Sequence, residues 1–237
     1  MEAVPSYVSI VFILTTFAAI AFLLRAMRRA RLGSLPSGLL FFLLPLWIFF
    51  QAVLAVGGFY QDSSTVPPRL VLFGVWPAVL LIAVYFIFFR KIFIERLPLQ
   101  TLTMLHIVRV PVEIVLLWLF FAGQVPRMMT FEGLNFDIVS GILAPVVYWA
   151  AFRGGRTRRG LLAAYNILGL FLLVNIVSIA ALSLPSPTQQ LNFDQPNRAV
   201  MFFPYVWLPT IVVPIVLFAH LSSLRKLFRG RSQNRVR

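Results

Sequence analysis

The chain contains 237 residues, of which 60% are hydrophobic and 12% are charged, and its formal net charge is +14. Soluble domains are about 25% charged, and apolar runs of about 20 residues recur here at bilayer-spanning length, so the composition excludes an ordinary soluble domain. It predicts an all-α multi-pass membrane protein. The chain has no cysteine, which excludes disulfides, thiolate nucleophiles and iron–sulfur clusters.

The positive charge predicts a topology rather than nucleic-acid binding, because most of it lies in alternate connections between apolar runs. The basic residues on this predicted side are Arg25, Arg28, Arg29, Arg31, Arg90, Lys91, Arg96, Arg153, Arg156, Arg158, Arg159, Arg225, Lys226, Arg229, Arg231, Arg235 and Arg237. The acids Glu2, Asp62, Glu132, Asp137 and Asp194 lie in the other connections. The positive-inside rule therefore predicts an outside N-terminus and a cytoplasmic C-terminus, with the bilayer and anionic lipids at its cytoplasmic face as partners.

The apolar runs predict a bundle of seven transmembrane helices. The expected spans are residues 7–24, 37–59, 70–89, 101–123, 138–152, 161–184 and 199–221. A basic cluster follows the first span and an acid precedes it. This order of charges is the reverse of that in a signal peptide, so the span is predicted to be an uncleaved anchor. We expect one membrane domain, residues 1–224, and a basic cytoplasmic tail, residues 225–237. Gln51 is expected to hydrogen-bond between helices rather than to bind a ligand.

The fourth span carries His106, Arg109 and Glu113 within an arc of roughly 60° on one side of a helix. A charge near the bilayer centre costs at least ~3 kcal/mol, so this face is expected to look into the protein as an intramembrane polar site. Gln124 falls on the same side by angle. In a proton pathway, the arginine partner of Glu113 would be exchanged for a proton or an anion. In the structural alternative, Arg109 and Glu113 form a buried ion pair that fixes helix packing.

The segment before the fifth span is rich in polar residues, and the span itself is short and interrupted by Gly141 and Pro145. Interrupted spans often line sites, although a kink also serves packing. The outer segments before the fifth and the seventh spans together are predicted to form an extracytoplasmic polar cluster for a cation or polar solute. Its members are Glu132, Asn135, Asp137, Asn192 and Asp194. Helix capping by Asp137 and Asn197 is the alternative.

The last two spans contribute further polar residues. Asn166 and Asn175 lie on opposite faces of the sixth span, so at least one is expected to contact another helix. Prolines at intervals of five predict a bent seventh span, with His220 near its cytoplasmic end. His106 and His220 fall at similar depth and offer two axial ligands for haem b as an alternative. Otherwise no cofactor is expected, and no metal, because a zinc site of this type needs three ligands.

The tetrapeptide LNFD occurs twice, at residues 134–137 and 191–194. If it marks a parallel duplication, the two loops are expected to lie near each other. The stretches HIVRVPVEI, MTFEGLNFDI and FDQPNRAVMFFPYVWLPTIVVPIVLFAHL resemble an uncharacterised family of bacterial multi-pass inner-membrane proteins. The resemblance covers the fourth to seventh spans, implies a bacterial inner (plasma) membrane and supplies no activity.

The sequence has no nucleophile elbow, phosphate-binding loop or metalloprotease helix, so it is not expected to be an enzyme. Our leading hypothesis is a polytopic membrane protein whose polar site serves proton-coupled or small-solute transport. The alternative is a non-enzymatic sensor or assembly partner that binds through its extracytoplasmic loops.

Overall fold

The computed structural model describes residues 4–30, 35–155 and 157–233, and the regular secondary structure of this part of the chain is all helical, with no strand. It contains seven helical segments long and apolar enough to cross a membrane, which confirms the all-α, seven-span part of the predicted fold class. These are Ser6–Arg29, Leu35–Val56, Val71–Phe88, Leu99–Phe121, Asp137–Gly155, Arg159–Leu182 and Leu208–Arg229. Glu2, Arg31, Arg156, Arg235 and Arg237, which contribute to the topology prediction, lie outside the described residues.

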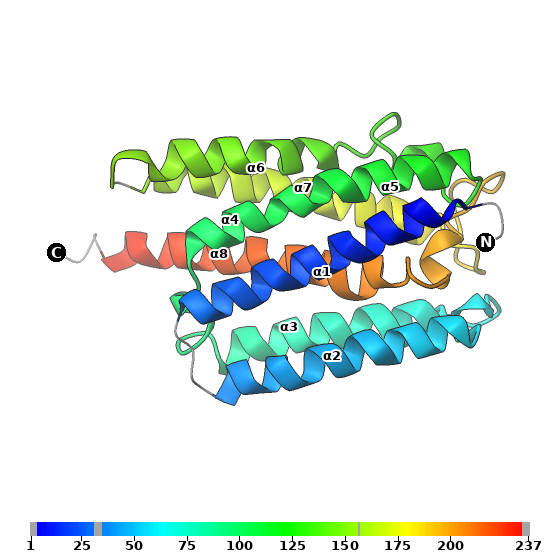
Figure 1. Cartoon of the computed structure of the whole chain (residues 1–237), viewed down its shortest axis with the longest axis horizontal. Coiled ribbons are helices and arrows are strands. Elements are labelled where there is room, and N and C mark those ends of the chain that lie inside the picture. Colours follow the sequence, from blue (N-terminus) through cyan, green and yellow to red (C-terminus); the bar gives the residue numbers. More distant parts are fainter. Residues whose placement is uncertain (1–3, 31–34, 156, 234–237) are drawn as a thin grey trace.

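Consecutive spans run in opposite directions along one axis (Figure 1). In Figure 1, α2 (Leu35–Val56) and α3 (Trp76–Phe88) form a hairpin at the bottom of the view, while α1 (Ser6–Arg29) and α8 (Val213–Gln233) separate that hairpin from the other helices. The remaining helices are α4 (Leu99–Leu105), α5 (Arg109–Phe121), α6 (Asp137–Phe152) and α7 (Arg159–Leu182).

Most basic residues of the described chain gather at one end of the bundle, which we call the basic end. It carries Arg25, Arg28, Arg29, Arg90, Lys91, Arg96, Arg153, Arg158, Arg159, Arg225, Lys226 and Arg229. The opposite end carries Asp62, Arg69, Arg127, Glu132, Asp194 and Arg198. Alternation of helix direction brings these separate stretches of sequence together, as the charge pattern predicts.

One span is built from two helices, because α4 and α5 are joined by a 3-10 turn, η4 (His106–Val108). Pro111 lies in the first turn of α5 and has no N–H to donate to the carbonyl one turn earlier. The tighter turn at η4 accommodates this interruption. Of the predicted stripe, His106 and Arg109 lie at or beside the break and Glu113 follows one turn later in α5. All three are buried.

Helix α6 begins inside the bundle rather than at its end. Asn135 Nδ2 donates to Glu113 Oε1 at 2.6 Å, and Glu113 lies eight residues before the end of α5, a rise of about 12 Å. The α5–α6 connection therefore folds back into the bundle, and Figure 1 shows α6 starting well short of the right-hand end of α5. Asn175 Nδ2 supports the connection by donating to the carbonyl of Leu134 at 2.8 Å. This fold-back explains why the fifth span is short.

The seventh span differs from its predicted range of 199–221. Residues Ala199–Met201 form a separate 3-10 turn, and the continuous helical segment starts with the π-helix η8 (Leu208–Val212). Pro204 precedes this segment, and Pro209 lies within its first turn. At the other end, α8 continues to Gln233, past the predicted start of the tail at Arg225. Lys226 Nζ holds this part of α8 by donating to the carbonyl of Leu97 at 2.7 Å.

Helix α2 is attached to its neighbours through carbonyl groups that prolines leave free. Gln51 Nε2 donates to Phe73 O at 3.0 Å, four residues before Pro77, which confirms the predicted interhelical hydrogen bond. Tyr60 donates in turn to Gln51 Oε1 at 2.7 Å, and burial raises the pKa of Tyr60 to about 12, so the phenol remains a donor at neutral pH.

Candidate intramembrane polar site

Arg109 is the centre of a polar network that joins four helices. Its guanidinium has five N–H groups, and each has an acceptor. Nε donates to Asp137 Oδ2 at 2.6 Å, and Nη2 pairs with Asp137 Oδ1 and donates to Gly169 O at 3.2 Å. Nη1 contacts Ser140 Oγ at 2.8 Å and His220 Nε2 at 3.0 Å. This fully buried arginine therefore holds α5 against α6, α7 and α8.

The partner of Arg109 is Asp137, so the predicted Arg109–Glu113 ion pair is wrong. Glu113 instead accepts a hydrogen bond from Asn135, whose Oδ1 accepts the backbone N–H of Asp137 at 3.1 Å. The reason is the fold-back before α6, which places the first carboxylate of α6 beside the guanidinium. The bidentate geometry that results is the strongest arrangement for an arginine and a carboxylate.

The hydrogen bonds of His220 define its tautomer. Because a guanidinium can only donate, the Nε2 atom that faces Arg109 must be an unprotonated acceptor. The Nδ1 atom then carries the proton and donates to Asn166 Oδ1 at 3.0 Å. Asn166 is oriented by its own Nδ2 group, which donates to the carbonyl of Leu162 at 2.7 Å. His220 is therefore a neutral imidazole fixed on both sides.

Two buried groups in the same region have atoms with no hydrogen-bond partner among the described residues. Both ring nitrogens of His106 are unpaired, and so is Glu113 Oε2. His106 is 0% and Glu113 is 1% exposed. A buried polar atom without a partner costs about 1–3 kcal/mol, so these atoms are where a proton, a water molecule or a solute group would be stabilised.

The two histidines come together, but their arrangement does not fit a haem. The rings of His106 and His220 are stacked, with centroids 3.8 Å apart and planes 14° from parallel. Axial ligands must point their nitrogens at an iron from opposite faces of a porphyrin, and two rings in face-to-face contact leave no room for one between them. Both nitrogens of His220 are also already hydrogen-bonded.

His220 lies deeper than predicted, because α8 extends 13 residues beyond it to Gln233. It is 0% exposed, whereas the sequence places it near the end of its span. The expectation that His106 and His220 lie at similar depth agrees with their stacking.

Two glycines permit the close helix contacts around the network. A Cβ on Gly169 would lie 2.4 Å from His220 Cε1, and a Cβ on Gly141 would lie 2.8 Å from Val110 Cγ2. The absence of these side chains lets α7 approach α8 and lets α6 approach α5. From the sequence, Gly141 is predicted only to interrupt the fifth span, and no local pattern indicates a role for Gly169.

The structure separates the remaining predicted site residues from the network. Gln124 lies beyond the end of α5 and donates to the carbonyl of Ala122 at 3.4 Å, so its predicted place on the polar face is wrong. Glu132 and Asp194 are exposed. Asn192 Nδ2 donates to Ser183 Oγ at 2.7 Å, next to the end of α7. The predicted outer cluster is thus divided, and among its members Asn135 and Asp137 are hydrogen-bonded to each other, inside the bundle.

The capping alternative is also wrong for both residues. The N-cap of α6 is Phe136 with no side-chain hydrogen bond, and Asp137 is the first helical residue. Asn197 Nδ2 donates to the carbonyl of Ala180 at 3.2 Å.

Some network residues were not identified from the sequence as part of the site. Ser140 accepts from Arg109 and lies one turn after Asp137 on the same face of α6, a spacing that signals a shared partner. Tyr165 Oη donates to the carbonyl of Ser140 at 2.9 Å. Among the residues that the structure describes, no group of three or more His, Cys, Asp or Glu side chains could hold a metal ion.

Comparison with known proteins shows the family of the chain. The chain belongs to the family described as domain of unknown function (DUF8737), which matches residues 66–228. The match includes every residue of the polar network. No curated protein and no solved structure matches the chain.

Proposed function

We propose that this member of the DUF8737 family is a proton-coupled transporter of small solutes and that the polar network around Arg109 is its proton and solute site. The observation that supports the proposal is Glu113, a buried carboxylate with one oxygen free. Its other oxygen is connected through Asn135 to the backbone of Asp137. Ionisable residues at membrane depth often serve proton and substrate pathways.

The Arg109–Asp137 ion pair provides the exchange of partners that coupling of proton and solute movement requires. In our proposal, Glu113 takes up the proton at its unpaired Oε2 atom, a water molecule carries it to the Asp137 carboxylate, and there the proton replaces Arg109 as the partner of that carboxylate. Arg109 is then free to bind the anionic group of a solute, with Ser140 and the carbonyl of Gly169 still orienting its guanidinium. Loss of the proton restores the Arg109–Asp137 pair and releases the solute. The proposal therefore specifies a small anionic solute.

The position of α6 favours this role. The N-terminal end of a helix carries a partial positive charge that stabilises carboxylates, and transporters place such helix ends at binding sites near the bilayer midplane. Here the first residue of α6 is Asp137, inside the bundle and paired with Arg109.

We infer that the protein resides in the inner membrane of a bacterium, with its N-terminus outside and the basic end in the cytoplasm. Support comes from the concentration of Arg and Lys at that end and the positive-inside rule. The resemblance of residues 106–114, 129–138 and 193–221 to bacterial inner-membrane proteins agrees with this location.

The alternative, a sensor or assembly partner without transport, is favoured by one observation. The second LNFD segment exposes Phe193, at 70%, and Asp194 at the end opposite the basic end. Cross-linking in membranes followed by purification separates the two functions, because a stoichiometric partner bound at these residues supports the alternative.

The proposed function is tested with purified protein in liposomes that contain a pH-sensitive dye. A filtered small-molecule cell extract is separated by anion exchange, and each fraction is added outside. We expect the retained, anionic fraction to accelerate proton movement and the unretained fraction to leave it unchanged. Equal proton movement with every fraction, or acceleration by the unretained fraction alone, would contradict an anionic solute.

A further inference from the structure

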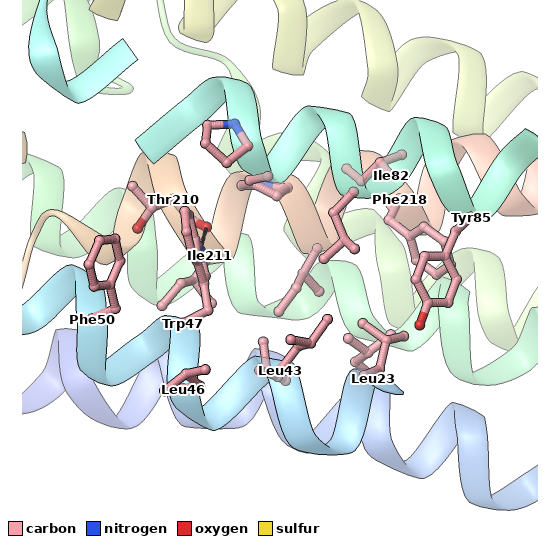
Figure 2. Close-up of a pocket in the computed structure, with 17 residues that line it drawn as sticks. Leu23, Leu43, Leu46, Trp47, Phe50, Ile82, Tyr85, Thr210, Ile211 and Phe218 are labelled. Carbon is pink, nitrogen blue, oxygen red and sulfur yellow. Dashed lines mark hydrogen bonds between the residues drawn. The ribbon is translucent and has the colours of Figure 1, made fainter. Parts of the chain in front are cut away.

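A second feature of the bundle lies apart from the polar network. A cavity of about 460 Å³ lies between the α2–α3 hairpin and helices α1 and α8. Figure 2 shows Leu23 and Tyr85 at one end of it and Phe50 and Thr210 at the other. Its volume is in the range of small-molecule sites, but none of the residues that line it is charged.

The cavity offers no free polar group to a ligand. Trp47 Nε1 donates to the carbonyl of Thr210 at 3.1 Å. That carbonyl has no partner within its own helix, because Pro214 lacks the N–H that would donate to it. Tyr85 Oη donates to the carbonyl of Pro36 at 2.6 Å. Ligand sites for polar molecules present a few convergent polar groups, so the occupant that fits here is a hydrocarbon chain.

The shape and direction of the cavity fit a chain that lies along the bilayer normal. Its lining residues on α3 extend from Pro77 to Tyr85, a rise of about 12 Å, parallel to the helix axes. On α2, Leu46 and Phe50 line the cavity and are also 55% and 44% exposed. The cavity is therefore continuous with the surface that faces lipid.

Charge at one end of the cavity identifies the headgroup. Leu23 and Tyr85 mark the end nearer the basic end of the bundle. Exposed Arg90 and Lys91 follow Tyr85 by five and six residues, just past the end of α3. These two cations complement a phosphate at the level of the lipid headgroups.

We propose that this cavity binds one acyl chain of an anionic phospholipid, with the phosphate held near Arg90 and Lys91. The lipid fills the space between the α2–α3 hairpin and α8 and joins the hairpin to the rest of the bundle. This site is independent of the polar network and of the proposed transport function.

The proposal is tested with a photoreactive phosphatidylglycerol that carries a diazirine on its acyl chain. The intact protein is reconstituted in liposomes that contain this lipid, irradiated and digested for mass spectrometry. Adducts on the lining peptides of α2 and α3 are expected. The Ala78→Trp variant fills the cavity and is expected to reduce them about tenfold, the effect of losing roughly two buried CH₂ groups. Leu80→Trp, at an exposed position of the same helix, is the matched control and retains the adducts.

A second variant tests the headgroup. Replacing Arg90 and Lys91 together by Gln is expected to remove the preference for phosphatidylglycerol over phosphatidylcholine while adducts still form. If Ala78→Trp does not fold, Ala78→Leu is used in the same comparison. Equal adduct formation in the cavity-filled and control variants would overturn the proposal. So would a protein, whether a second copy or another chain, cross-linked to the cavity residues in native membranes.

Discussion

His106 lies face to face on His220, with the ring centroids 3.8 Å apart. The two residues differ in their hydrogen bonds: His220 is fixed by Arg109 and Asn166, whereas both nitrogens of His106 have no partner among the described residues. Of these two stacked imidazoles, His106 is therefore the one free to exchange a proton without breaking an existing hydrogen bond.

The tautomer of His220 is the first prediction. Because Arg109 donates to Nε2, the proton of His220 is expected on Nδ1. Nitrogen-15 NMR of protein labelled only in histidine measures this, and His106→Gln assigns the remaining signals to His220. An Nε2-protonated or doubly protonated ring at neutral pH would contradict the network.

The second prediction concerns the Arg109–Asp137 pair. Asp137→Asn leaves the guanidinium buried without its counter-charge, which is expected to lower the free energy of unfolding by about 3–5 kcal/mol. Asp62→Asn removes the partner of Arg69 in an ion pair at the surface and is expected to change stability little. Unfolding in mixed micelles by added denaturant compares them, and equal stability of the two variants would exclude a structural role for the pair.

The third prediction tests the contact between α7 and α8. Gly169→Ala places a methyl group 2.4 Å from His220 Cε1 and is expected to destabilise the protein by about 1–3 kcal/mol through overpacking. Gly160→Ala, in the same helix, meets nothing within 4 Å and is expected to be neutral or stabilising. If thermal unfolding gives the two variants the same midpoint, the close approach of α7 to His220 is not present in the membrane.

The seven spans could be predicted from the sequence because length and hydropathy alone decide whether a helix can cross a bilayer. The last span shows the limit of that signal. Helix α8 continues through Arg225 and Lys226 to Gln233. Its basic side chains have partners there, because Lys226 donates to the carbonyl of Leu97 and Arg229 forms an ion pair with Glu95. Hydropathy does not record such contacts.

The site could be predicted only in part. The common face of His106, Arg109 and Glu113 follows from helical spacing, and the structure buries all three. The partner of Arg109 could not be predicted, because Asp137 approaches it only through the fold-back of the α5–α6 connection. That fold-back depends on tertiary hydrogen bonds, such as the one from Asn135 to Glu113, which no local pattern indicates.

The fourth prediction tests topology. The chain has no cysteine, so single substitutions report directly on accessibility. Ser63→Cys and Thr157→Cys place a thiol at exposed positions of opposite ends. In intact cells a membrane-impermeant maleimide is expected to label Ser63→Cys alone, and Thr157→Cys only after permeabilisation. The reverse pattern would invert the proposed orientation.

The most direct test of the central claim is proton movement catalysed by the Glu113→Gln variant. Protein is reconstituted in liposomes with small-molecule extract on both sides, a pH gradient is imposed, and an internal dye follows the pH. We expect the native protein and the Asp62→Asn control to move protons faster than empty liposomes, and Glu113→Gln to fall to the rate of empty liposomes. If Glu113→Gln moves protons as fast as the native protein, or if the native protein does not exceed empty liposomes, the proposed proton pathway is contradicted.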